Sequence, residues 1–423
     1  MGQKIFRKGW WREVSRRVGP GVITGAADDD PSGIATYAQA GASFGYSTLW
    51  VPVFTTPLMA GVQEMCARIG IVTRHGLAGT MRRYYSRWLL YGVAAAVFAA
   101  NTINIGADLA AVGAAVKLVA PQIPVGVTVA AFAAGVMAVV IWSSYRKIAT
   151  IFKWLTLSLG FYILAAAAAN PDWNQVWRQT IWPHLVFDKR FFLIIVAMLG
   201  TTISPYLFFW QASTEAEEKM LGKGPYGWFK RFLVSRKEMT VMREDVGVGM
   251  IFSNLAMYFV AMAAAATLFR EGLAITTAAD VARALAPIAG DWAGLIFAVG
   301  IIGTGALAVP VLAGSAAYAA SEAFGWQTGL NKAFNKAKAF YSVMAISTLL
   351  GLGLTWLKLD AVKMLFWTAV MYGLLSPPLI GVVLHVANNE KVMGKWRNGR
   401  WENILGIATL VVMTLAGLGL LLQ

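Results

Sequence analysis

Apolar runs of about 20 residues alternate with short polar connections along almost the whole chain. That is the length an α-helix needs to cross the hydrocarbon core of a bilayer. The pattern predicts an all-α membrane protein with eleven transmembrane helices, at residues 18–42, 47–67, 88–119, 124–142, 151–169, 191–218, 246–269, 292–320, 340–357, 362–386 and 404–422.

Two of these spans are interrupted by helix-breaking residues. The first contains Asp-Asp-Asp-Pro-Ser-Gly at 28–33, and the sixth contains Gly-Thr-Thr-Ile-Ser-Pro-Tyr at 200–206. A proline in mid-membrane removes a backbone hydrogen bond and frees nearby carbonyl groups. The breaks occupy corresponding positions of two five-span halves, which is typical of inverted-repeat transporters. We therefore predict two inverted five-helix repeats with broken helices 1 and 6, at 18–169 and 170–386. A cytoplasmic segment, 1–17, precedes them, and a loop with helix 11 follows at 387–423.

The acidic triplet beside the first break indicates a functional site. A carboxylate at the bilayer centre costs about 2.5–3.5 kcal/mol, so it normally lines a functional cavity. Beside a break it can share a cation with freed carbonyl groups. Consecutive helical residues point roughly 100° apart, so the three cannot all face one ion. We expect Asp28 and Asp29 to lie near a vestibule or to bond neighbouring helices.

Composition and charge agree with a membrane location. The chain is 58% hydrophobic and 13% charged, with a mean hydropathy of +0.59. Its formal charge of +15 arises from Lys and Arg in alternate connections, so we expect no nucleic-acid partner. With a cytoplasmic N-terminus, 27 of the 36 basic residues lie inside, which predicts an external C-terminus. The single cysteine, Cys66, excludes an internal disulfide, and we expect no cleavable signal peptide.

The motifs resemble those of the Nramp family of divalent metal transporters. Residues 30–33, Asp-Pro-Ser-Gly, are similar to its helix 1 motif Asp-Pro-Gly-Asn, and residues 200–206 to its helix 6 motif Gly-Ala-Thr-Val-Met-Pro-His. Residues 67–73, 107–110, 392–394 and 397–400 resemble its segments at the end of helix 2, in helix 3 and before helix 11. The resemblance runs nearly end to end and implies the family's fold of eleven helices, the first ten in two inverted repeats.

The chain departs from the family at two metal-binding positions. The helix 1 asparagine and the helix 6 methionine of the family correspond here to Gly33 and Ser204. Thioether sulfur suits softer transition metals, whereas carboxylate, carbonyl, hydroxyl and water suit Mg²⁺. Mg²⁺ also keeps several waters, so a roomier site fits it. The combination resembles the Nramp-related magnesium transporter branch and implies Mg²⁺ as substrate, with Mn²⁺ as a second one.

The resemblance implies a metal site at the two breaks. Asp30 supplies the charge, and Ala27 and Thr201 offer backbone carbonyl groups. Ser204 offers a hydroxyl or a water contact, and Gly33 stands where the family has its asparagine.

The resemblance also implies that proton coupling is lost. The family's helix 6 histidines fall on Tyr206 and Gln211, and two helix 3 glutamate positions are Asn101 and Ala111. None of these side chains titrates near neutral pH. Of the titratable helix 3 residues only Asp108 remains. The candidate ion-path residues are therefore Asn101, Asn104, Asp108, Tyr206 and Gln211, and interhelical hydrogen bonding remains open as the role of Asn101, Asn104 and Gln211.

These features favour a transporter or facilitator that moves Mg²⁺, and also Mn²⁺, into the cell across the cell membrane by alternating access without protons. A proton-coupled Mn²⁺ or Fe²⁺ transporter, a sodium-coupled amino-acid symporter and a membrane-embedded enzyme or receptor remain alternatives. The sequence has no nucleophile–base set and no phosphate-binding loop, so we expect neither an enzyme nor a cofactor. The expected partners are a divalent cation and the lipid bilayer, with no obligate protein partner. Glu64 in the second span is expected to pair with a neighbouring helix.

Overall fold

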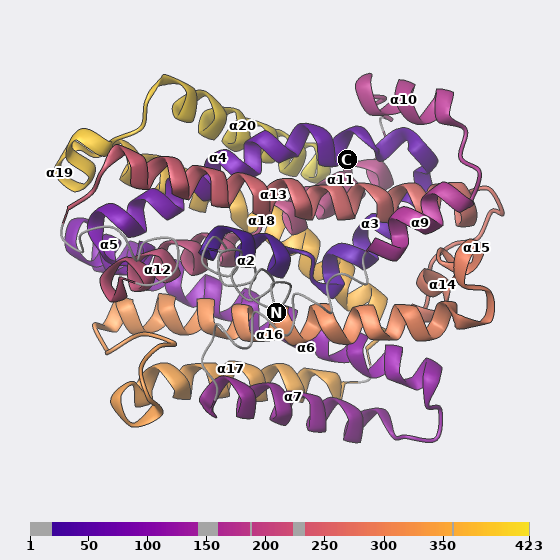
Figure 1. The fold of residues 1–423 in the computed structure, drawn as a ribbon, viewed down its shortest axis with the longest axis horizontal. Helices are drawn as coiled ribbons and strands as arrows, with labels where there is room; N and C mark the ends of the chain where they lie inside the picture. The colour runs from indigo at the N-terminus through magenta and orange to yellow at the C-terminus, as the bar shows by residue number, and fades with distance from the viewer. Residues whose placement is uncertain (1–18, 143–159, 187, 223–232, 358, 423) are drawn as a thin grey trace, which may run out of the picture.

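The computed structural model describes residues 19–142, 160–186, 188–222, 233–357 and 359–422, and these ranges are helical without a strand. The long helices run side by side along the longest axis of the molecule (Figure 1). Within the described ranges, eight helices or joined helix pairs are long and apolar enough to cross a membrane. The chain is therefore a multi-pass membrane protein.

Helices occupy all or part of each predicted span. Seven spans are single long helices: α4 (Trp50–Thr73), α6 (Arg87–Val119), α7 (Val125–Trp142), α16 (Ala293–Phe324), α17 (Lys338–Thr355), α18 (Ala361–Asn388) and α20 (Arg400–Leu421). An eighth, α13 (Arg236–Ala264), continues into a π-helical turn, Ala265–Phe269. The fifth span is represented by α9 (Gly160–Ala168). Its predicted beginning at 151–159, like the N-terminal segment 1–17, lies outside the described residues.

The first and sixth spans are each divided into two helices, as predicted. α2 (Pro20–Asp28) and α3 (Pro31–Phe44) are separated by two residues, and so are α11 (Lys189–Thr202) and α12 (Pro205–Leu221). Pro31 and Pro205 each occupy the first position of the second helix, where the missing N–H needs no partner. The same residue type therefore sets both breaks.

α2 packs directly on the backbone of α13. A Cβ atom on Gly249 would stand 2.2 Å from the carbonyl oxygen of Gly21, so only glycine permits this approach. The Asp245 carboxylate on α13 accepts hydrogen bonds from the N–H groups of Gly19 at 2.8 Å and Gly21 at 2.7 Å. Asp245 thus caps the first turn of α2 from a different helix.

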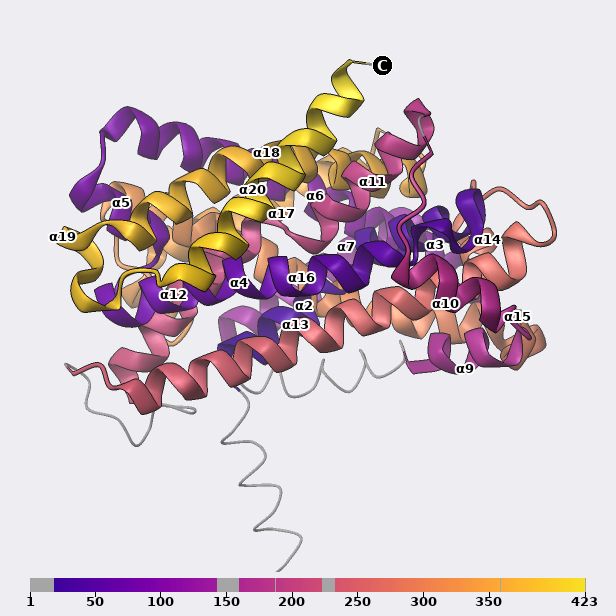
Figure 2. The ribbon, with the colours of Figure 1, turned by 90° about the horizontal axis from the view of Figure 1, so that it is seen from above.

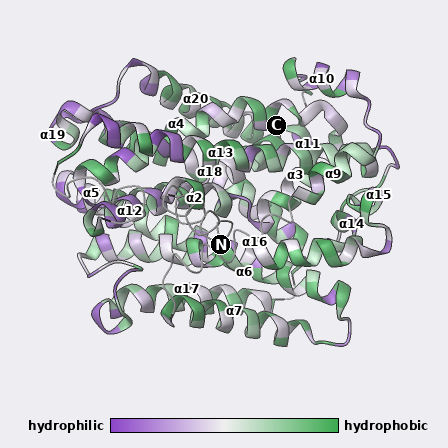
Figure 3. Ribbon diagram, in the orientation of Figure 1, coloured by the Kyte–Doolittle hydropathy of each residue, from purple (hydrophilic) through white to green (hydrophobic). Residues whose placement is uncertain are grey.

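The remaining helices enclose the two breaks. α16 packs along α6, with α17 and α7 outside them, while α4 and α20 lie on the opposite side of the molecule (Figures 1 and 2). Hydrophilic residues gather at the end that carries α5 (Leu77–Tyr84) and α19 (Glu390–Met393), called the α5 end below (Figure 3). The opposite end carries the short helices α10 (Trp173–Ile181), α14 (Ala278–Arg283) and α15 (Ala286–Ala289).

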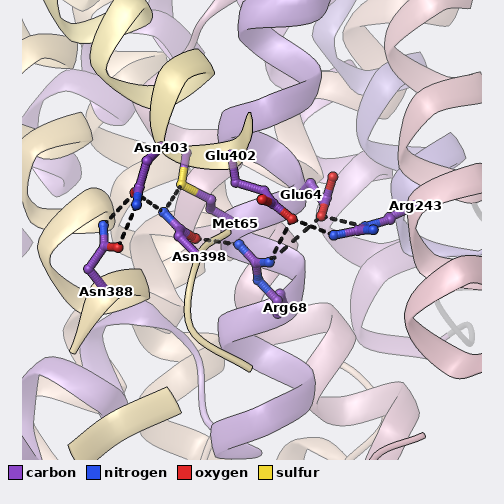
Figure 4. A network of polar contacts seen from close by, with 8 residues as sticks. All are labelled: Glu64, Met65, Arg68, Arg243, Asn388, Asn398, Glu402 and Asn403. Carbon is purple, nitrogen blue, oxygen red and sulfur yellow. Dashed lines mark hydrogen bonds and ion pairs between the residues drawn. The ribbon is translucent and has the colours of Figure 1, made fainter. Parts of the chain in front are cut away.

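A charged network near the α5 end joins α4, α13 and α20 (Figure 4). Arg243 Nε donates to Glu64 Oε1 at 2.7 Å, which confirms the predicted pairing of Glu64 with a neighbouring helix. The Arg243 side chain is 50% exposed, so its ion pairs add little to stability. Arg68 is only 5% exposed; it bonds Asn398 and lies 3.4 Å from Glu402. Two segments that carry the family resemblance, at 67–73 and 397–400, are therefore in contact.

Candidate functional site

Asp30 is a buried residue in the short gap between α2 and α3, and its carboxylate is held by neutral donors. Oδ1 accepts from the backbone N–H of Gly33 at 2.7 Å and from the Ser32 hydroxyl at 2.6 Å. Oδ2 accepts from Asn104 Nδ2 on α6 at 3.0 Å. No Lys, Arg or His of the described residues forms an ion pair with Asp30. The carboxylate is thus fixed in place without a described basic side chain in an ion pair with it.

α6 contributes further oxygen atoms next to Asp30. Asn104 Oδ1 and both carboxylate oxygens of Asp108, one turn along, are buried and have no hydrogen-bond donor among the described residues. Buried acceptors normally have a donor or a cation, because desolvation without one is costly. Asp30, Asn104 and Asp108 therefore form an acceptor-rich cluster of the kind that a cation can satisfy.

Asn101 lies one turn from Asn104, and both polar atoms of its amide bond other helices. Its Nδ2 donates to the carbonyl of Leu312 on α16 at 3.0 Å, and its Oδ1 accepts from the Tyr372 hydroxyl on α18 at 2.9 Å. The sequence left two roles open for Asn101, lining the ion path or bonding neighbouring helices. Its contacts in this conformation are of the second kind.

The two breaks are joined through α12. The Tyr206 hydroxyl donates to the carbonyl oxygen of Ala27 at 3.1 Å. Further along α12, Gln211 accepts a hydrogen bond from Thr24 on α2 and donates to Glu215 at 2.8 Å. Both candidate ion-path residues on α12 thus bind α2. The Ala27 carbonyl, which was predicted to bind the metal, accepts a hydrogen bond from Tyr206 in this conformation.

Ser204 and Thr201 turn toward α11 itself. The Ser204 hydroxyl lies 2.9 Å from the carbonyl of Gly200 and 2.7 Å from that of Thr201, and the Thr201 hydroxyl donates to Met198 at 3.0 Å. In the described part of the chain, no hydrogen bond joins either residue to Asp30. The Ser204 contacts cap two of the last four carbonyl groups of α11, those of Gly200 and Thr201.

Asp28 and Asp29 face α13. The sequence predicts that they either lie near a vestibule or bond neighbouring helices, and their contacts are of the second kind. Ser253 Oγ lies 2.8 Å from Asp28 Oδ2 and 2.8 Å from Asp29 Oδ1. Gly33 also faces α13: a Cβ atom there would stand 3.4 Å from Met257 Sδ and 3.5 Å from Asp30 Oδ1. The acidic triplet is therefore divided, with Asp30 directed to α6 and its two neighbours to α13.

Sequence reasoning missed the serines that complete the breaks. Ser315 on α16 donates to the carbonyl of Tyr206 at 2.7 Å, and Ser376 on α18 donates to that of Ile203 at 2.8 Å. Neighbouring helices commonly satisfy freed carbonyl groups in this way. A single serine inside an apolar span, as at 253, 315 and 376, is the only signal that the sequence offers for this role.

A cavity of about 640 Å³ opens at the α5 end between α5, α12 and α16. Its lining includes Arg74, Gly79, Ser213, Glu217, Tyr318 and Glu322. The Glu322 carboxylate accepts from the N–H of Gly79 at 2.8 Å and from Ser213 at 3.0 Å, so it ties the three helices together. None of the predicted site residues lines this cavity, so it does not reach Asp30 in this conformation.

Comparison with known proteins agrees with this arrangement. The family described as "Natural resistance-associated macrophage protein-like" (Nramp) matches residues 21–423. The divalent metal cation transporter MntH of Caldanaerobacter subterraneus subsp. tengcongensis is 26% identical over 422 residues, covering 96% of this chain and 93% of that relative. MntH of Aeromonas hydrophila subsp. hydrophila is 28% identical over 413 residues, covering 95% and 93%.

Solved structures share the fold. The manganese transporter of Eremococcus coleocola superposes with a TM-score of 0.73 at 18% identity, covering 97% of this chain and 86% of that one. MhsT in complex with L-phenylalanine superposes less closely, with a TM-score of 0.56 at 12% identity, covering 95% and 97%. With the family match over nearly the whole chain, these findings establish that the chain belongs to the Nramp family and is a membrane transporter, not an enzyme.

Proposed function

We propose that this protein moves Mg²⁺, and also Mn²⁺, into the cell by alternating access and without protons. The observation that carries the proposal is the buried Asp30 carboxylate at a helix break, next to the donor-free oxygens of Asn104 and Asp108. A divalent cation would bring positive charge to this group of buried acceptors. Its inward movement gains about 4.6 kcal/mol per 100 mV of membrane potential, because it carries two charges.

The preference for Mg²⁺ rests on the donor atoms at the two breaks. Asp30 brings the charge, and Ala27 and Thr201 bring carbonyl groups. The Ala27 carbonyl accepts a hydrogen bond from the Tyr206 hydroxyl, and the Thr201 carbonyl lies 2.7 Å from the Ser204 hydroxyl. A carbonyl oxygen still has a second lone pair for a cation. Ser204 offers oxygen where the family's methionine would offer sulfur. Oxygen donors with retained water suit Mg²⁺.

We further propose that the eleven spans form two inverted repeats, at 18–169 and 170–386, with the α5 end in the cytoplasm. Both broken helices are divided by two residues followed by proline, which supports the correspondence of spans one and six. The basic residues concentrate in the connections assigned to the cytoplasm, and the α5 end carries the hydrophilic residues (Figure 3). The 640 Å³ cavity then opens to the cytoplasm.

Proton independence is tested by recording Mg²⁺ flux into proteoliposomes together with internal pH. We expect uptake to respond to voltage but not to a pH gradient imposed at fixed voltage. The reason is that the hydroxyl of Tyr206 and the amides of Gln211 and Asn101 occupy hydrogen-bonded positions and do not titrate near neutral pH.

The second candidate function, a proton-coupled Mn²⁺ transporter, is favoured by the donor-free carboxylate of Asp108. Metal-dependent acidification of the vesicle interior that disappears in Asp108→Asn would establish it and exclude the uncoupled mechanism. Uptake that leaves internal pH constant, in the unaltered protein and at whatever rate remains in Asp108→Asn, would support the proposal.

Selectivity is tested by restoring the family's ligands. In the double variant Gly33→Asn with Ser204→Met, we expect Cd²⁺ and Mn²⁺ binding to strengthen severalfold relative to Mg²⁺, because a soft ligand is added and the site is narrowed. Position 33 has room for a Cβ atom, whose contacts of 3.4 Å or more are ordinary. Competition binding on purified protein measures the ratio. An unchanged ratio would place selectivity elsewhere, for example in the number of waters that the approach route admits.

A further inference from the structure

One face of α13 lies against the first break over three successive positions spaced by four residues. Gly249 contacts the backbone of α2, and Ser253 lies at hydrogen-bond distance from Asp28 and Asp29. Met257 is 3% exposed and places its sulfur beside Gly33. Residues four apart lie on one side of a helix, so this face forms a wall of the break from end to end.

Gly33 leaves a space around which atoms of ligand type converge. The position that its Cβ atom would occupy is 3.4 Å from Met257 Sδ, 3.5 Å from Asp30 Oδ1 and 3.6 Å from the carbonyl oxygen of Asp28. A thioether, a carboxylate and a carbonyl therefore surround one point next to the charge of the site. An asparagine at this position would fill the space that the sulfur now faces.

We propose that Met257 is the sulfur ligand of softer divalent cations at the Asp30 site. The inference rests on the proposed function and names the residue that sets how well Mn²⁺ and Cd²⁺ compete with Mg²⁺. Thioether sulfur binds soft cations, whereas Mg²⁺ prefers oxygen ligands and keeps its bound water. Methionine has three rotatable side-chain bonds, so its sulfur can turn toward a soft ion and away from a hydrated one. The sulfur absent from position 204 is thus supplied from α13.

The test compares Met257→Leu with Met262→Leu, a matched variant of a fully buried methionine on the same helix. We expect Met257→Leu to weaken Cd²⁺ binding by about tenfold, as loss of a metal-site group typically does, and to leave Mg²⁺ uptake unchanged. Met262→Leu should change neither. X-ray absorption of the cadmium-loaded protein should show Cd–S scattering that Met257→Leu removes and that Cys66→Ser, which removes the single thiol, retains.

Cd–S scattering and Cd²⁺ affinity that persist in Met257→Leu would overturn the inference. So would an equal loss of Cd²⁺ and Mg²⁺ binding, because that would mark Met257 as a packing residue. Asp30→Asn, measured in parallel, separates this failure from failure of the proposed function. If Asp30→Asn binds Cd²⁺ and Mg²⁺ as tightly as the unaltered protein does, the metal site is not at Asp30. The proposed function then fails, independently of the result for Met257→Leu.

Discussion

Transport of Mg²⁺ and Mn²⁺ is expected to be lost when Asp30 is replaced by alanine. Asp30 brings the negative charge to the proposed site, and no described basic side chain neutralises it there. Asp28 and Asp29 cannot replace it, because their carboxylates face Ser253 on α13 and not Asn104 on α6. Radioactive or fluorescent flux into proteoliposomes measures the loss.

Asp30→Asn sharpens this experiment. Alanine removes the hydrogen bond to the N–H of Gly33, and loss of such a cap costs roughly 0.5–2 kcal/mol, so part of the effect could come from stability. Asparagine caps a helix as well as aspartate does but carries no charge. We expect Asp30→Asn to unfold at nearly the temperature of the unaltered protein and still not to transport. Normal flux in Asp30→Asn together with lost flux in Asp28→Asn would contradict the prediction, because it would show that Asp28 and not Asp30 binds the metal.

The second large effect is expected from Gly249→Ala. The new Cβ atom would stand 2.2 Å from the carbonyl oxygen of Gly21 and 3.0 Å from the Cα of Val22, and backbone atoms cannot turn away. α2 and α13 must therefore separate, at a cost of about 1–3 kcal/mol for overpacking. Because α2 leads directly into the acidic triplet, flux should fall together with the unfolding temperature.

Gly247→Ala is the matched control, two residues away on the same helix. A Cβ atom at Gly247 meets nothing within 4 Å among the described residues, so this variant should gain up to about 1 kcal/mol from helix propensity. Thermal unfolding in detergent ranks the two variants. Equal unfolding temperatures for Gly249→Ala and Gly247→Ala would show that the helices adjust freely and that close packing here is unimportant.

The sequence was sufficient to predict the helix breaks, because a proline in the middle of an apolar span, next to Asp, Ser and Gly, favours the end of one helix and the start of another. It also pointed to Asp30, since carboxylates are rare enough in membranes to stand out, and the family resemblance pointed to Asp108. Their proximity to Asn104 followed from the structure alone. A residue's neighbours on other helices depend on how each helix is rotated, and apolar spans of low amphipathicity carry little information on that rotation.

The orientation of the hydroxyl groups was beyond sequence reasoning for a related reason. Ser204 can bond either an ion or the carbonyl groups one turn earlier, and the two choices differ only in a side-chain torsion. Ser253 was overlooked because one serine among apolar residues is inconspicuous until Asp28 and Asp29 are seen to face it. The two breaks can thus be predicted from the sequence, whereas the atoms that complete them come from five helices, α6, α12, α13, α16 and α18.

We expect the cap that Asp245 places on α2 to influence which helices separate during a transport cycle. The Asp245 carboxylate accepts hydrogen bonds from the N–H groups of Gly19 and Gly21, and glycine contacts join the same two helices, so we expect α2 and α13 to move together. α12, in contrast, is joined to α2 through side chains, by Tyr206 to Ala27 and Thr24 to Gln211. Side-chain hydrogen bonds can exchange with water at little net cost, whereas a glycine-packed backbone contact cannot. We therefore expect the route from Asp30 to the α5 end to open between α2 and α12, with α13 moving together with α2.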